Sequence, residues 1–95
     1  MLQIIDFIPY GKENAKTAEE LADTIGTSER EVRRMINEAR RENVVLNMQD
    51  GNGYFRPTEK EKDLAERWLK QEESRLKLHA LALRAVRRSL KEVQA

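Results

Sequence analysis

The sequence contains no cysteine, which excludes a disulfide framework, a thiolate metal site and a cysteine nucleophile. It has a single histidine, His79, so we expect no histidine-based zinc site. No apolar run exceeds a few residues, whereas a membrane-spanning helix needs about 20. Aromatic residues make up 5% of the chain, which leaves little material for a β-rich core. These absences favour one small helical protein of 95 residues that needs no cofactor or metal and does not enter a membrane.

The sequence also offers little catalytic chemistry. Its only glycine cluster, around Gly51 and Gly53, lies between two predicted strands and does not form a phosphate-binding loop. No acid lies within a helical turn after His79, and most carboxylates sit at helix starts or among basic residues. The first residues lack the basic start and the long apolar stretch of a signal peptide. We therefore expect a cytoplasmic protein that is not an enzyme.

Charge is segregated along the chain although the net charge is only +1. Residues 1–57 carry eight Lys or Arg and ten Asp or Glu, a net charge of −2. Residues 58–95 carry ten basic and seven acidic residues, a net charge of +3. Residues 75–91 contain six basic residues and no acid. A local basic patch can bind a polyanion without a high overall pI.

Residues 1–57 show the pattern of a small domain with three helices and a hairpin. Residues 2–8 are apolar-rich, and we predict a short helix there, followed by a polar loop over 11–16. Thr17 and Glu20 form a capping-box pattern at the start of a helix that Gly26 ends. Ser28 opens a second helix, again with a capping-box pattern, which runs to about residue 42. Two capped helices joined by a glycine-containing turn indicate a helix-turn-helix.

A β-hairpin is predicted after the second helix. Val44, Leu46 and Met48 alternate with Val45, Asn47 and Gln49, as in a half-buried strand. Residues 50–53 (Asp-Gly-Asn-Gly) supply the turn, residues 54–56 the return strand, and Pro57 ends it.

Residues 58–95 are predicted to be helical, with Thr58 as the cap and no internal proline or glycine. Such a helix would be about 57 Å long, whereas a compact chain of this size has a radius of gyration of about 12 Å. It must therefore break in two or project and pair with another molecule. Leucines recur every seven residues, and His79, Val86 and Val93 fill the complementary heptad positions. The residues predicted to hold a homodimer through a coiled coil are Leu76, Leu83, Val86 and Leu90.

The helix from Ser28 sorts its side chains by direction. At 100° per residue, Val32, Ile36 and their neighbours point inward. The outward ridge consists of Arg30, Arg34, Asn37 and Arg41, flanked on one side by Arg33 and Arg40. The acids Glu31 and Glu38 fall on the other side. A helix that reads DNA in the major groove needs this arrangement, because Arg can bridge guanine O6 and N7 and Asn can bridge adenine N6 and N7. A solvated helix face is the alternative.

Leu21, Ala22, Ile25, Gly26 and Ser28, followed by Val32 and Ile36, resemble the helix-turn-helix core of many bacterial and phage regulators. With the hairpin as a wing, residues 2–57 resemble a winged helix-turn-helix, similar to small winged-helix proteins of phages and prophages of Gram-positive bacteria. The resemblance implies that the helix from Ser28 enters the major groove and that the hairpin tip touches phosphate or the minor groove. Here the tip is acidic, so only Arg56, at the base of the hairpin, is expected to contribute.

We therefore predict a mostly α fold with a small β-hairpin: a winged helix-turn-helix domain (1–57) and a C-terminal helical segment (58–95) that forms a homodimer. The predicted function is sequence-selective binding of double-stranded DNA, in transcription regulation or as a phage replication or packaging accessory protein. Arg30, Arg34 and Asn37 would read bases; Arg33, Arg40 and Arg41 would contact phosphates; Thr17 and Ser28 would donate to phosphate. The alternative is a protein-interaction adaptor on the same scaffold. The basic stripe of Lys77, Arg84, Arg88 and Lys91 would suit DNA backbone or an acidic protein, or be the solvated flank of a dimer helix.

Overall fold

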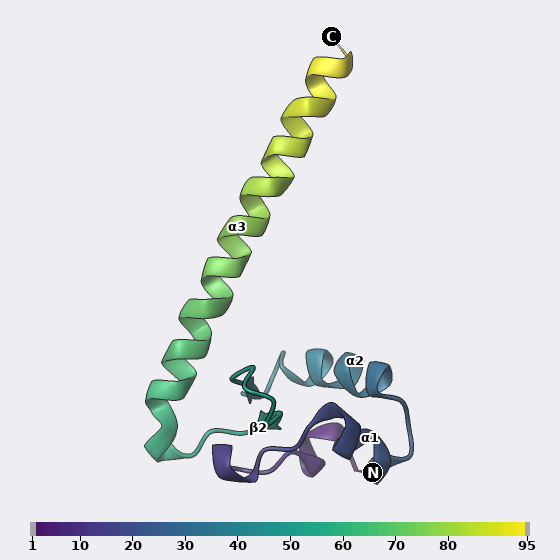
Figure 1. The fold of residues 1–95 in the computed structure, drawn as a ribbon, viewed down its shortest axis with the longest axis vertical. Coiled ribbons are helices and arrows are strands. Elements are labelled where there is room, and N and C mark those ends of the chain that lie inside the picture. Colours follow the sequence, from purple (N-terminus) through teal and green to yellow (C-terminus); the bar gives the residue numbers. More distant parts are fainter. Residues whose placement is uncertain (1, 95) are drawn as a thin grey trace.

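The computed structural model describes residues 2–94, and side chains as far as Glu92, so the side chain of Val93 lies outside the described residues. The elements in chain order are the 3-10 helices η1 (Ile4–Phe7) and η2 (Lys12–Asn14), helices α1 (Ala18–Ile25) and α2 (Glu29–Ala39), strands β1 (Leu46–Asn47) and β2 (Tyr54–Phe55), the 3-10 helix η3 (Glu59–Glu61) and helix α3 (Lys62–Gln94). The chain is thus mostly helical with one two-stranded antiparallel sheet. Figure 1 shows a small domain at the N-terminal end, from which α3 projects.

Helices α1 and α2 begin at the predicted caps. The Thr17 hydroxyl accepts a hydrogen bond from the backbone N–H of Glu20 (3.1 Å), and the Glu20 carboxylate accepts one from the N–H of Thr17 (3.1 Å). Gly26 ends α1 in the left-handed conformation, with φ +82°. Only half of the second predicted capping box forms. Ser28 accepts from the N–H of Glu31 (3.1 Å), but the Glu31 carboxylate binds Arg34 instead.

Helix α2 is three residues shorter than predicted. It ends at Ala39, whose carbonyl accepts hydrogen bonds from both the backbone and the side-chain amide of Asn43 (each 3.0 Å). These two bonds close a turn that directs the chain into β1.

The hairpin forms where it was predicted, but its burial does not alternate. Leu46 pairs with Phe55 and both are fully buried, yet Val45 is buried too and Val44 is exposed. The prediction of one apolar face formed by Val44, Leu46 and Met48 was therefore wrong. The reason is that β1 has only two residues, so Val45 lies before the ladder and is free to turn into the helical core.

The predicted polar loop over 11–16 also pairs with the hairpin. Lys16 and Tyr54 exchange two backbone hydrogen bonds (2.9 and 2.7 Å). The N–H of Arg56 donates to the carbonyl of Pro9 (2.7 Å), and the N–H of Gly11 donates to the carbonyl of Arg56 (2.8 Å). Two bridges therefore extend the hairpin beyond its two strands.

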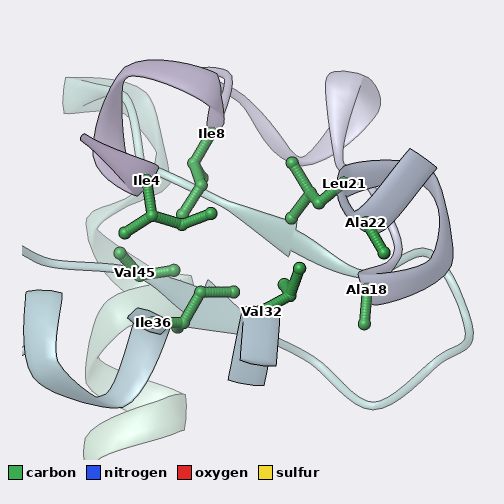
Figure 2. Packing of buried hydrophobic residues seen from close by; sticks show 8 residues of the cluster. All are labelled: Ile4, Ile8, Ala18, Leu21, Ala22, Val32, Ile36 and Val45. Atoms are coloured by element: carbon green, nitrogen blue, oxygen red, sulfur yellow. The ribbon is translucent and has the colours of Figure 1, made fainter. Parts of the chain in front are cut away.

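The core lies between η1, α1, α2 and the residue that precedes β1 (Figure 2). Its buried members are Ile4, Ile8, Ala18, Leu21, Ala22, Val32, Ile36 and Val45. The small side chains of Ala18 and Ala22 allow α1 to lie close to α2. The same packing fixes which face of α2 is buried and which face remains outside.

The sequence left two possibilities for α3, a break into two helices or a projecting helix. Helix α3 is continuous and projects from the domain (Figure 1). Its 33 residues correspond to about 50 Å, and the radius of gyration is 17.2 Å. The carboxylate of Glu61 anchors its start by accepting from the N–H groups of Thr58 (3.0 Å) and Lys12 (2.9 Å), which lower the pKa of Glu61. Within residues 2–94, no helix is long and apolar enough to cross a membrane.

Candidate nucleic-acid interface

Helix α2 has one buried face and one exposed face. Val32 and Ile36 have no solvent exposure, because they pack against α1 and η1. The exposed residues on the opposite side include Arg30, Arg34 and Asn37, and Arg41 is exposed two residues after the end of the helix. Three of the four residues that the sequence placed on one ridge therefore lie on the exposed side of α2, whereas Arg41 lies in the turn after it, because the helix ends at Ala39. Within residues 2–94, Arg30 and Arg41 have no carboxylate at ion-pair distance.

Arg34 differs from its neighbours on the ridge, because it is bound by two acids. Its Nε donates to Glu31 (3.0 Å), and its Nη1 lies 3.1 Å from the carboxylate of Glu38. The hydrogen bond with Glu31, followed by the charges of Glu31 and Glu38, raises the pKa of Arg34. The sequence-based separation of these acids from the ridge was therefore wrong for Arg34, since its long side chain reaches across about 50° of the helix surface.

Arg33 lies on the side of α2 that faces the hairpin. Its guanidinium pairs with Glu29 one turn earlier (3.4 Å), and more than half of its side chain remains exposed. It lines an open groove between the starts of α1 and α2 and the hairpin. The other residues lining this groove are Thr17, Ala18, Glu19, Glu29, Asn47, Gln49, Gly51, Gly53 and Tyr54. The groove thus joins the Arg33 flank of α2 to the hairpin tip.

Arg40 does not point outward with the other basic residues. Its Nε donates to the carbonyl of Val45 (3.0 Å), and its guanidinium lies 5.2 Å from the ring centroid of Trp68 and 5.7 Å from that of Tyr54. Burial lowers the pKa of Arg40. It thereby connects α2, the hairpin and α3. The prediction that Arg40 contacts phosphate is not supported by this position, since its Nε–H is bound to Val45 and its guanidinium lies against the rings of Tyr54 and Trp68.

We expect Arg40→Ala to lower the free energy of unfolding by about 2–3 kcal/mol, because it removes a charged hydrogen bond and two cation–π contacts. The adjacent Arg41→Ala is the matched control: Arg41 is exposed, and its loss should change stability by no more than about 0.5 kcal/mol. Urea unfolding followed by Trp68 fluorescence measures both. Equal midpoints for the two variants would contradict the structural role of Arg40.

Three further predicted contact residues, Thr17, Ser28 and Arg56, have defined contacts within the domain. The Oγ atoms of Thr17 and Ser28 accept from backbone N–H groups, which leaves each hydroxyl proton free to donate. The guanidinium of Arg56 lies 4.4 Å from the ring centroid of Tyr10, so it is held at the base of the hairpin.

The hairpin tip contacts two other elements, which the sequence did not predict. Asp50 forms an ion pair with Lys12 (3.3 Å), and its pKa is lowered first by the N–H of Asn52 and then by Lys12. The side-chain oxygen of Gln49 accepts from Arg75 on α3 (2.8 Å). The sequence contains one indication that the first part of α3 packs on the domain. It is the single tryptophan, Trp68, near the start of the long helix.

The residues predicted to mediate oligomerisation lie beyond this contact. Leu76, Leu83, Val86 and Leu90 are all exposed, with Leu76 at 70% and Leu83 at 44%. The basic side chains Lys77, Arg84, Arg88 and Lys91 are exposed on the same part of α3.

Comparisons with models of protein families, with curated proteins and with solved structures find no match to this chain.

Proposed function

We propose that the N-terminal domain is a winged helix-turn-helix that binds double-stranded DNA, with α2 in the major groove. The observation that supports this most is the exposed face of α2, where Arg30 and Asn37 are presented by a helix whose opposite face is packed in the core, with Arg41 exposed in the turn that follows. Guanidinium and amide groups on a rigid helix are suited to reading base edges. The pairing of β1 with β2 next to this helix is consistent with a wing.

The positions of the basic residues suggest separate roles. Arg30 and Asn37 would read bases, and Arg41 would contact phosphate at the end of α2. To bind DNA, Arg34 would have to give up its ion pairs with Glu31 and Glu38, whereas Arg33 would give up only its ion pair with Glu29. Thr17 and Ser28 would donate their hydroxyl protons to phosphates, and Arg56 would contact the backbone at the base of the wing. Arg40 would act only by holding the fold together.

The biological setting of such binding would be transcription regulation, or replication or packaging in a phage. The rival function is a protein-interaction adaptor, and the ion pairs of Arg34 with two acids on α2 favour it. The two functions differ in how binding depends on salt.

We expect duplex binding with a slope of log K against log salt of about −4 per protomer, since four or five basic groups would each contribute about −0.9. Gel shifts at several salt concentrations, first on random duplex and then on selected sequences, measure this slope. Arg30→Ala should weaken binding to the selected site by about 5- to 150-fold and relax selectivity at one base pair. Lys60→Ala, on η3, is the control and should change neither. A flat slope, or no binding at low salt, would favour the adaptor.

A further inference from the structure

Beyond Arg75, α3 carries an apolar seam that nothing in the described chain covers. The seam consists of Leu76, His79, Leu83, Val86 and Leu90, which fall within about 80° of one another around the helix. All five are exposed. Exposed single leucines are ordinary, but a seam that repeats over three turns or more is typical of a surface that pairs with another helix.

The seam continues the face by which α3 packs on its own domain. Ala65, Trp68 and Glu72 lie in the same sector of the helix, Leu64 lies beside it, and all four are half-buried. The most C-terminal hydrogen bond between α3 and the domain, within the described residues, runs from Arg75 to Gln49. Leu69 and Glu73 border the seam on its other side and are exposed, so the domain leaves room there for a second helix.

Charge along α3 is polarised in a way that distinguishes the two directions of pairing. Residues 59–73 contain six acids and four bases, whereas residues 75–91 contain six bases and no acid. A parallel partner in register would place the two basic segments side by side, with no acid between them. An antiparallel partner with its two-fold axis near Leu81 also brings the two basic segments together, but it places Glu72 and Glu73 of each helix beside residues 87–91 of the other and opposes the two helix dipoles.

We propose that the seam binds a second copy of this chain in antiparallel orientation, with the two-fold axis near Leu81. In this register Leu76 faces Val86 of the second copy, and His79 faces Leu83 of the second copy. Glu73 then lies beside Arg87 of the second copy. By symmetry, Arg87 lies beside Glu73 of the second copy at the other end of the seam. Ala80 and Ala82 flank the seam at its centre, where small side chains allow the helices to approach closely. A parallel dimer would instead stack the two His79 side chains and would form neither charge pair.

This arrangement determines the distance between the two domains. Each domain contacts α3 around Trp68, which would lie opposite Gln94 of the second copy. The two domains would thus be separated by 26 residues of helix, or about 39 Å along its axis. That distance is close to one turn of B-DNA, about 34–36 Å. The match to two half-sites rests on the proposed function, whereas the antiparallel pairing does not.

The absence of native cysteine allows the orientation to be tested in the full-length chain. Leu76→Cys and Val86→Cys variants are prepared separately, mixed, and equilibrated in a thiol–disulfide buffer. Antiparallel pairing predicts a disulfide only in the mixture, between the two different variants, because the Cα atoms of facing seam residues are close enough to be bridged. A parallel dimer would form disulfides within each variant alone. That result, or a monomer in sedimentation of the intact chain, would overturn the proposal.

A charge exchange tests the register independently of cysteine chemistry. Glu73→Arg or Arg87→Glu alone should weaken the dimer on the order of tenfold, because each introduces two like-charge contacts per dimer. The double variant should restore the wild-type dissociation constant. Arg84→Glu is the control, since Arg84 lies away from the seam, and it should have little effect. No rescue by the double variant would exclude this register. Dimer formation is measured without DNA, so a dimer that binds no duplex would refute only the proposed function.

Discussion

Gly53→Ala is expected to destabilise the N-terminal domain by about 3–5 kcal/mol, which is enough to unfold most of a domain this small. Gly53 has φ +99°, a conformation that alanine rarely adopts. A Cβ atom there would also overlap the carbonyl group of Lys16 and lie 2.6 Å from the nitrogen of Thr17, and these backbone atoms cannot rotate away. Relief would require separating β2 from the segment before α1, which breaks both hydrogen bonds between Lys16 and Tyr54.

Gly51→Ala provides the matched control for this prediction. Gly51 has a similar φ of +86°, but an added Cβ would meet no atom within 4 Å, so only the backbone strain of about 1 kcal/mol remains. Thermal unfolding followed by Trp68 fluorescence reports on the domain, because Trp68 packs on Arg40, whereas circular dichroism also includes the long helix. If the two variants melt at the same temperature, the close approach of Gly53 to Lys16 does not exist in solution.

Leu83→Glu combined with Leu90→Glu is expected to lower the affinity for a duplex with two half-sites by about 10²- to 10⁴-fold. The reason is that a second domain tethered by the proposed dimer would bind the duplex at a high effective concentration, and this advantage would disappear when two charges enter the apolar seam. Every basic residue of α2 and α3 is retained, so lost dimerisation is separated from lost positive charge on the proposed DNA-binding face. Affinity for a duplex with one half-site should change little.

Leu78→Glu combined with Leu81→Glu is the control for this double variant. These two leucines are exposed on the same segment of α3 but lie outside the seam, and the net charge changes equally. Sedimentation and gel shifts should show a dimer with nearly normal affinity. A monomer from the control pair would indicate a larger helical assembly, and a wild-type affinity in the seam variant would show that one copy is sufficient for binding.

The local signals of the sequence predicted the elements well. Helix α1 begins after Thr17 and ends before Gly26, and α2 begins after Ser28, as predicted. These ends were predictable because a cap depends on residues within one turn of it. The buried face of α2 also agrees with the 3.6-residue period of Val32 and Ile36. The early end of α2 was not predicted, because it depends on the side chain of Asn43 folding back onto Ala39.

The candidate interface was predicted only in part. A helical wheel assigns each side chain a direction but not a length, so it missed that Arg34 reaches Glu31 and Glu38. It placed Arg40 on a flank of the ridge, because the wheel contains no neighbouring elements. Tyr54 and Trp68 are 14 and 28 residues away from Arg40 in the chain, and only folding brings their rings to its guanidinium.

Composition and periodicity were therefore sufficient to place helices α1, α2 and α3, the hairpin and the exposed basic residues of α2, because each depends on residues close in the chain. The tertiary structure decided the course of α3 and the surroundings of each charged group. It shows that the Arg40 contact with Trp68 and the Arg75 bond to Gln49 hold the first part of α3 on the domain, while the rest projects. Such contacts join residues 26 or 28 positions apart, and their formation depends on the packing of the whole domain.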